Sequence, residues 1–279
     1  MNSRVTLKKR LWALFYVALM SGCGTVHHNL SPISSASILR AADANGVSTW
    51  AVLPASYSPA AQSPWIIYNH GFGQEIETIF TNPSQSFFIH DLVQAGFIVI
   101  ATDYRNLACW GDAECTEDLT NLQSLWHSKL NLEPQPFVIG ESMGGIVMWN
   151  AIAHGTLKPQ AAVGIYPVCN LAAMYAEPTF VPTIQAAYGF TSSAGYTAAT
   201  SGFDPLLTLP SRFVAVPIQM WASDSDHVVR RSQNEDVFAQ QINGVGGEVI
   251  IHTSFGEHGN PSNFDAPAVI SFFRSHSKV

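Results

Sequence analysis

The sequence is poor in charge: only 12% of its 279 residues are Asp, Glu, Lys or Arg, whereas 47% are apolar. A chain that remains disordered needs the opposite balance, so the composition excludes that class and predicts a folded core. Acidic residues outnumber basic ones, and the formal net charge is −7. A protein of this sign is not expected to bind nucleic acid.

The first 22 residues lack acidic side chains altogether. Four basic side chains lie there: Arg4, Lys8, Lys9 and Arg10. Without this segment the formal charge falls from −7 to −11. The apolar run at residues 11–20 is too short to span a bilayer as a helix, but it has the length of the core of a secretory signal. We therefore predict that residues 1–22 are a signal peptide.

Small residues stand directly before the next cysteine, in Ser21-Gly22-Cys23. This pattern resembles the lipobox of bacterial lipoproteins, although Met20 stands where that family usually has leucine. The resemblance implies cleavage before Cys23, a diacylglycerol on its sulfur and a polar tether at residues 23–37. The mature chain is then expected to be a membrane-anchored lipoprotein of the bacterial cell envelope, on the periplasmic or outer-membrane side. The alternative is an ordinary signal peptide cleaved nearby.

Cysteine is scarce beyond that point, and two of the remaining three lie six residues apart, at Cys109 and Cys115. Gly111 and Asp112 between them suit a tight turn, and an oxidising compartment permits a disulfide, which we predict. Two free thiols or a pair of zinc ligands are the alternatives. The pair lacks a second cysteine pair or a nearby histidine, so we expect no metal. No dinucleotide-binding fingerprint is present either, and no cofactor is expected.

Short apolar runs alternate with helical patterns from residue 47 onward. A first strand is predicted at residues 47–53, and the apolar runs lie at residues 65–68, 97–101, 137–139, 161–165, 218–221 and 249–251. Such continuous runs are typical of strands covered on both faces. The helical patterns lie at residues 87–95, 117–130, 143–153, 231–242 and 266–276. This alternation predicts an α/β fold with a mostly parallel central sheet and helices on both faces.

One segment, residues 169–213, interrupts the alternation because it is rich in Pro, Gly, Ser and Thr and shows no strand pattern. Its aromatic residues include Tyr175, Phe180, Tyr188 and Phe190. A segment of this length inside a compact domain is expected to be a small cap over the functional site. A surface excursion without a functional role is the alternative. We therefore predict one domain at residues 38–279 that carries a cap at about residues 169–213.

The clearest motif is G-x-S-x-G at Gly140-Glu141-Ser142-Met143-Gly144, between a predicted strand and a predicted helix. In this strand–turn–helix setting the pattern indicates a nucleophile elbow, a strained turn that exposes the serine hydroxyl. The amide of Met143 then lies at a helix N-terminus, where negative charge is stabilised. Ser142 is therefore the predicted nucleophile.

A second glycine-rich turn, residues 69–73, follows the strand predicted at 65–68. With both turns in place, the sequence resembles the α/β-hydrolase family over about residues 47–276. The resemblance implies that the amides of Phe72 and Met143 form an oxyanion hole, and that His70 is structural.

The family resemblance also narrows the search for an acid and a base, which follow the serine in chain order. Asp226 lies in the loop after the strand at 218–221, and one residue separates it from Val228 and Val229. This arrangement resembles the acid loop of the family. Asp224 is the alternative acid, or else it shapes the turn. His258 lies in a G-x-H-G loop after the last strand, which resembles the histidine loop. His252 is the alternative base, although it falls within that strand.

The resemblance implies a serine hydrolase that works through an acyl-enzyme, and it does not imply a substrate. Cleavage of small-molecule or lipid carboxylic esters is the function that we predict. Related dehalogenases and epoxide hydrolases carry aspartate at the elbow, and dienelactone hydrolases carry cysteine, so Ser142 argues against those reactions. Two alternatives remain. One is a small peptidase of the prolyl-oligopeptidase type, although the chain has no room for the propeller domain that those enzymes usually carry. The other is a non-catalytic envelope lipoprotein on a hydrolase scaffold.

Overall fold

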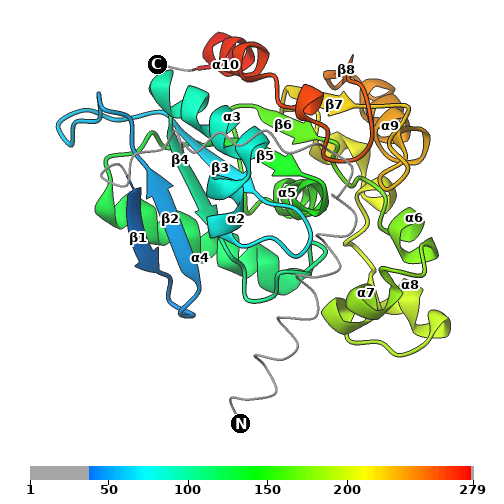
Figure 1. Ribbon diagram of the computed structural model, residues 1–279. Coiled ribbons are helices and arrows are strands. Elements are labelled where there is room, and N and C mark those ends of the chain that lie inside the picture. The colour runs from blue at the N-terminus through cyan, green and yellow to red at the C-terminus, as the bar shows by residue number, and fades with distance from the viewer. Residues whose placement is uncertain (1–37, 278–279) are drawn as a thin grey trace.

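The computed structural model describes residues 38–277 (Figure 1). The predicted signal peptide, the predicted lipidation site Cys23 and the predicted tether lie outside the described residues. Within residues 38–277, no helix has both the length and the apolarity that crossing a membrane requires.

Eight strands form a single sheet in the order β1-β2-β4-β3-β5-β6-β7-β8. Their bounds are Ile38–Ala42 (β1), Ser48–Val52 (β2), Trp65–Asn69 (β3), Ile98–Thr102 (β4), Phe137–Glu141 (β5), Ala162–Ile165 (β6), Ile218–Ala222 (β7) and Val249–Thr253 (β8). β2 is antiparallel to both of its neighbours, and every other pairing is parallel. The mostly parallel sheet predicted from the apolar runs is therefore confirmed.

The central strands are covered on both faces, which explains their unbroken apolar runs. Every residue of β3, β4, β5 and β6 is buried. β1, by contrast, lies at the edge of the sheet and is only partly buried. Its sequence has no apolar run that marks a strand, and the sequence reading missed it.

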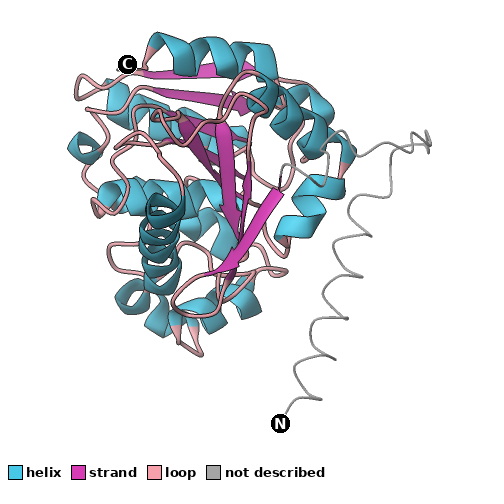
Figure 2. Ribbon diagram, turned by 90° about the vertical axis from the view of Figure 1, so that its left-hand side faces the viewer, coloured by secondary structure: helices cyan, strands magenta, loops and turns pink. Residues whose placement is uncertain are grey.

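Helices pack against both faces of the sheet (Figure 2). One face is covered by α4 (Ala113–Lys129), α5 (Met143–Ala153) and α9 (Glu235–Asn243), and the other by α2 (Ile76–Thr81), α3 (Pro83–Gln94) and α10 (Ala266–Ser275). The sequence reading missed α2 and placed the start of α3 four residues too late. Pro83 occupies the first turn of α3, and the side chain of Asn82 accepts a hydrogen bond from the amide of Ser84, so the helix begins there.

Residues 169–213 form an insertion between β6 and β7 that contains no strand, as its composition predicts. It holds α6 (Leu171–Ala176), α7 (Val181–Tyr188), the short α8 (Tyr196–Ala199) and three 3-10 turns, Ser193–Gly195, Pro205–Leu207 and Pro210–Arg212. In Figure 1 its helices α6, α7 and α8 lie together at the lower right. This segment is called the insertion below.

Candidate active site

Ser142 lies in the tight turn between β5 and α5, as the elbow motif predicts. Its backbone has φ 51° and ψ −120°, a strained conformation for a residue with a side chain. The turn closes only because its neighbours are small: a Cβ on Gly144 would overlap the carbonyl oxygen of Asn69 on the adjacent strand. The amide of Ser142 donates to the carbonyl of Ile165, which fixes the turn against β6.

Three predicted site residues meet in one hydrogen-bonded chain. The Oγ of Ser142 lies 2.9 Å from Nε2 of His258, and Nδ1 of His258 lies 2.7 Å from Oδ2 of Asp226. The other carboxylate oxygen of Asp226 accepts from the amides of Val228 and Val229, at 2.8 and 2.9 Å. With its carboxylate fixed in this way, Asp226 can accept a hydrogen bond from Nδ1–H of His258, which leaves Nε2 as the acceptor for the hydroxyl hydrogen of Ser142.

The alternatives considered for the acid and the base lie apart from this chain. The side chain of Asp224 is 81% exposed and pairs with Arg231 at 3.5 Å. His252 stacks on Trp221 in β7, with ring centroids 4.4 Å apart, and its Nε2 lies 3.0 Å from the side chain of Gln219. Asp226 and His258 are thus the acid and the histidine that the fold brings to Ser142.

The glycine-rich turn after β3 lies directly beside the elbow. A Cβ on Gly71 would lie 3.4 Å from the Cβ of Ser142, so the turn passes in contact with the serine. The amide of Gly71 donates to Oε1 of Gln74 at 2.9 Å, which anchors the turn from inside. Phe72 is the next residue of the turn after Gly71, and Met143 is the first residue of α5. Phe72 thus follows the residue that contacts Ser142, and Met143 follows Ser142 directly along the chain.

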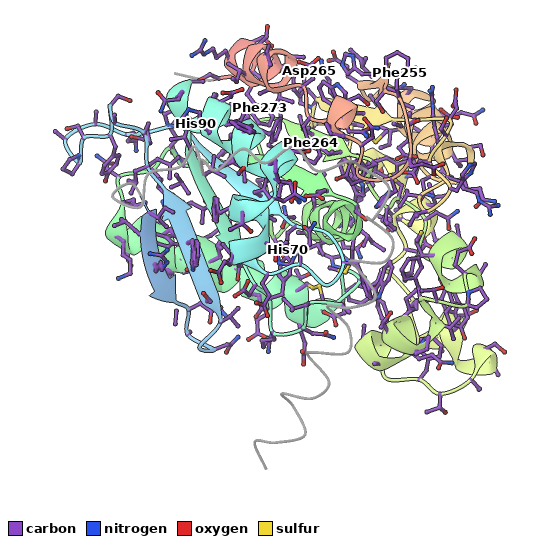
Figure 3. The ribbon with its side chains drawn as sticks, in the orientation of Figure 1. His70, His90, Phe255, Phe264, Asp265 and Phe273 are labelled. Atoms are coloured by element: carbon purple, nitrogen blue, oxygen red, sulfur yellow. A yellow bond between two sulfur atoms is a disulfide. The ribbon has the colours of Figure 1, made fainter. Side chains whose placement is uncertain are left out.

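His70 lies inside the molecule (Figure 3), fully buried, with its Nδ1 3.0 Å from the carbonyl of Gly71. Burial lowers the pKa of His70, and the nearby charges of Asp103 and Glu141 oppose that shift only in part. A buried neutral imidazole packed on the ring of Tyr104, at 4.9 Å between centroids, is a structural element of the turn. This placement agrees with the role inferred from the resemblance.

An aromatic cluster joins the glycine-rich turn to the insertion. Phe72 contacts Trp110 and Phe180, with centroid distances of 5.4 and 5.6 Å, and Trp110 contacts Phe180 at 5.1 Å. The indole of Trp110 donates to the hydroxyl of Thr183 in α7 at 3.0 Å. The insertion is therefore docked next to Ser142 through apolar rings.

The loop that carries Trp110 is closed by a disulfide between Cys109 and Cys115, with Cα atoms 6.3 Å apart. Cys169 is a buried free thiol, and burial raises its pKa well above the usual value. Within the described residues, no cluster of three or more His, Cys, Asp or Glu side chains could hold a metal ion.

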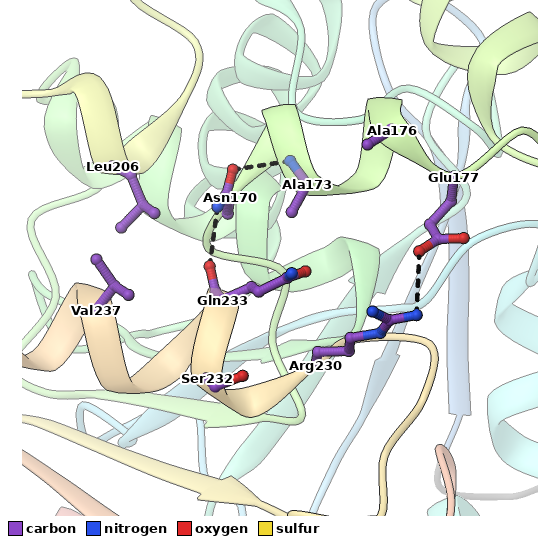
Figure 4. Close-up of a pocket in the computed structure, with 9 residues that line it drawn as sticks. All are labelled: Asn170, Ala173, Ala176, Glu177, Leu206, Arg230, Ser232, Gln233 and Val237. Atoms are coloured by element: carbon purple, nitrogen blue, oxygen red, sulfur yellow. Dashed lines mark hydrogen bonds and ion pairs between the residues drawn. The ribbon is translucent and has the colours of Figure 1, made fainter.

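A pocket of about 560 Å³ lies between α6 of the insertion and the start of α9 (Figure 4). Apolar side chains of Leu206 and Val237 line it, together with the polar groups of Asn170 and Gln233. Arg230 spans one side and lies 3.7 Å from Glu177. Ser142, His258 and Asp226 do not line this pocket.

Sequence reasoning missed one buried residue of the site, Glu141, which directly precedes the serine. It is the only charged residue in the otherwise apolar strand β5, where a carboxylate is costly unless it is hydrogen-bonded. That placement was the signal that could have identified it. Its partners come from three other parts of the chain, which no local pattern reveals.

The comparisons with solved structures support the fold. No protein-family model matches the sequence, and no curated protein matches it. Brefeldin A esterase, a bacterial homologue of human hormone-sensitive lipase, superimposes with a TM-score of 0.67 at 16% identity, over 99% of this chain and 87% of its own. An acylaminoacyl peptidase from Pyrococcus horikoshii superimposes with a TM-score of 0.67 at 14% identity, and a puromycin-hydrolysing peptidase from Mycobacterium tuberculosis with 0.68 at 18%.

The matches to the two peptidases cover most of this chain but less than half of each peptidase. The matches include 94% and 90% of this chain but only 44% and 41% of the two peptidases, so the chain spans less than half their length. Together with the strand order, in which only β2 runs against the rest, these similarities show an α/β-hydrolase fold. The predicted fold is thereby confirmed.

Proposed function

We propose that the chain is a serine hydrolase that cleaves carboxylic esters through an acyl-enzyme. The observation that carries the proposal is the continuous chain of hydrogen bonds from Ser142 through His258 to Asp226. Neither a binding scaffold nor a structural protein needs a strained serine, an oriented imidazole and a buried carboxylate in this order.

The geometry supports the following reaction. As Oγ of Ser142 attacks the acyl carbonyl, its proton passes to Nε2 of His258, and Asp226 stabilises the imidazolium that forms. The amides of Phe72 and Met143 bind the developing oxyanion. His258 then returns the proton to the leaving alcohol, and a water molecule activated by the same imidazole hydrolyses the acyl-enzyme.

An apolar acyl group fits the surroundings best. Phe72 adjoins the glycine-rich turn and packs with Trp110 and Phe180, which supports an aromatic wall beside the reacting carbon. The insertion supplies Phe180 to this cluster, which supports a role for the insertion as a cap. Burial of an apolar acyl chain against such rings contributes about 25 cal/mol for each Å² removed from water.

Amide hydrolysis is the second candidate, because two of the structural neighbours are peptidases, with TM-scores of 0.67 and 0.68 beside 0.67 for the esterase. The leaving group decides between the two functions. A panel that pairs p-nitrophenyl acyl esters with acyl-amino-acid p-nitroanilides of the same acyl group measures the preference directly. We expect turnover of the esters to exceed that of the anilides.

Replacement of the nucleophile tests the proposal. Ser142→Ala removes the attacking oxygen, and we expect ester turnover to fall by about 10⁴-fold or more and fluorophosphonate labelling to vanish. Asp226→Asn, which deprives His258 of its charged partner, should follow at about 10²-fold or more. The matched control is Asp224→Asn, two residues away and exposed, which should retain activity. Unchanged labelling of Ser142→Ala would refute the assignment.

A further inference from the structure

Glu141, the residue before the nucleophile, has an unusually complete set of hydrogen-bond donors. Its side chain is only 2% exposed, and its Oε2 accepts from the hydroxyl of Tyr68 at 2.6 Å and from the amide of Gln85. Its Oε1 accepts from the hydroxyl of Tyr166 at 2.8 Å and from the amide of Gln74 at 3.3 Å. Four donors on two oxygens fit an ionised carboxylate, because a protonated carboxyl would place its own hydrogen against a donor.

Two of these donors lead to the reacting groups, and the first is Tyr166. Its ring lies edge-on against the imidazole of His258, with centroids 4.5 Å apart. Its backbone has φ 37°, a left-handed conformation that a tyrosine adopts only at a cost, just after β6. The amide of Tyr166 donates to the carbonyl of Trp221 at 2.8 Å. The hydrogen bond from its hydroxyl to Glu141 fixes the far end of the ring, so Tyr166, which packs against His258, is held both at its backbone and at its hydroxyl.

The second donor is Gln74, which leads to the glycine-rich turn. Its Nε2 donates to Glu141 at 3.3 Å, and its Oε1 accepts two hydrogen bonds, from the amide of Gly71 at 2.9 Å and from the side-chain amide of Gln85 at 3.2 Å. A carboxylate can accept but not donate, so Glu141 decides which end of this amide points at the turn. The same carboxylate thus reaches both sides of Ser142.

We infer that Glu141 is a positioning residue, whose buried carboxylate sets the orientation of His258 through Tyr166 and of the Gly71–Phe72 turn through Gln74. This inference deepens the proposed hydrolase function and rests on it. A misplacement of about 1 Å in a catalytic group costs on the order of 10²-fold in rate, so a small release of the imidazole is measurable.

The chain offers a matched pair of variants for the test. Tyr166→Phe and Tyr68→Phe each remove one hydroxyl donor from Glu141, but only the ring of Tyr166 packs against His258. With a p-nitrophenyl ester, we expect Tyr166→Phe to lower kcat about tenfold with KM unchanged within about twofold. Tyr68→Phe should lower kcat by less than about threefold. Glu141→Gln, which turns an amide nitrogen toward two of the donors, should lower kcat by about 10²-fold.

Proton NMR gives a readout that does not depend on the substrate. The Nδ1 proton shared by His258 and Asp226 resonates far downfield of the amide protons when the hydrogen bond is short. We expect Tyr166→Phe and Glu141→Gln to shift or broaden this signal, and Tyr68→Phe to leave it in place. A purely structural role would instead lower the thermal unfolding midpoints of the two tyrosine variants equally and leave their NMR signals alike.

The outcomes separate the two proposals. If wild-type Ser142 reacts with a fluorophosphonate probe but Tyr166→Phe matches Tyr68→Phe in both kcat and the downfield signal, the positioning role is wrong and the hydrolase remains. If wild-type Ser142 does not react with the probe, the proposed function fails, and the positioning role fails with it.

Discussion

Two glutamates, Glu141 and Glu235, are almost equally buried, and they differ in every other respect. Glu141 receives hydrogen bonds from four side chains. Glu235, the first residue of α9, is completely buried, yet neither of its carboxyl oxygens receives a hydrogen bond from another residue within 38–277. Burial raises the pKa of Glu235 well above its usual value, and the neighbouring charges of Asp226 and Asp236 raise it further.

The difference shows that burial alone does not decide what a carboxyl group does. The donors around Glu141 replace the water it has lost, so it can remain ionised and orient its neighbours. Glu235 has no such replacement and is held as the neutral acid. The carboxyl group of Glu141 accepts hydrogen bonds from four side chains, whereas that of Glu235 is buried without such donors and keeps its proton.

The largest expected effect on stability follows from removing the carboxylate of Glu141. Glu141→Leu removes the carboxylate that accepts from the hydroxyls of Tyr68 and Tyr166, and one of the two acceptors of the side-chain amide of Gln85. Each buried hydrogen bond that is lost in this way costs about 1–3 kcal/mol, so we expect the free energy of unfolding to fall by about 3 kcal/mol or more. Urea denaturation followed by circular dichroism measures the loss.

The triple variant Glu141→Leu, Tyr68→Phe and Tyr166→Phe is the control for this prediction. It removes the hydroxyl donors together with their acceptor and should recover part of the lost stability, since paired deletions cost less than orphaned groups. A loss below about 1 kcal/mol for Glu141→Leu would show that the four hydrogen bonds contribute little.

The sequence alone predicted the parts of this molecule that local patterns encode. Local patterns predicted seven of the eight strands, and the runs of β3 to β6 are the clearest because every residue of these four strands is buried. Ser142, Asp226 and His258 each follow a strand at the same edge of the sheet, and the chain order was enough to bring them together. Asp226 was chosen over Asp224 because of its spacing from Val228 and Val229. The backbone amides of these two valines donate to the carboxylate of Asp226.

The support around the site could not be predicted, because it depends on contacts between distant residues. Tyr68 and Glu141 are 73 residues apart, and Gln85 and Glu141 are 56 apart. Nothing in the local sequence of either partner indicates the other. The edge strand β1 and the short helix α2 were missed for a related reason: their stability comes from packing on the domain rather than from their own pattern.

The second effect in size concerns Glu235. Because the pKa of Glu235 is raised in the folded protein, its contribution to stability is fully present below pH 4.5, the ordinary pKa of glutamate. This contribution is lost as the pH rises toward the pKa of the folded state, because only the unfolded chain ionises in that interval. Glu235→Gln has no proton to lose. We expect its thermal midpoint to equal that of the wild type near pH 4.5 and to exceed it by about 2 °C or more at pH 8.

Glu117→Gln is the control of opposite sign for this measurement. The hydrogen bond and charge of Arg105 lower the pKa of Glu117, so any stability it adds is present above its ordinary pKa of 4.5 and lost as the pH falls. A stability difference between Glu235→Gln and the wild type that does not change with pH would contradict the neutral state of Glu235.

The smallest effect is expected at Asp112, which is intermediate between the two glutamates. It caps α4 by accepting the amide of Cys115 at 2.9 Å. Burial raises its pKa to about 6, although the amide of Cys115 opposes the shift. Its stability contribution is therefore complete below its ordinary pKa of 3.8 and declines as the pH rises through about 6.

Asp112→Asn separates the cap from the charge, because asparagine accepts the same amide but does not ionise. We expect equal thermal midpoints for this variant and the wild type below pH 3.8, and a gain of less than about 2 °C for the variant above pH 6. Asp112→Ala, which loses the cap as well, should be less stable at every pH by about 1 kcal/mol. If Asp112→Asn is instead the less stable protein above pH 6, the ionised carboxylate stabilises the cap, and Asp112 then resembles Glu141 rather than Glu235.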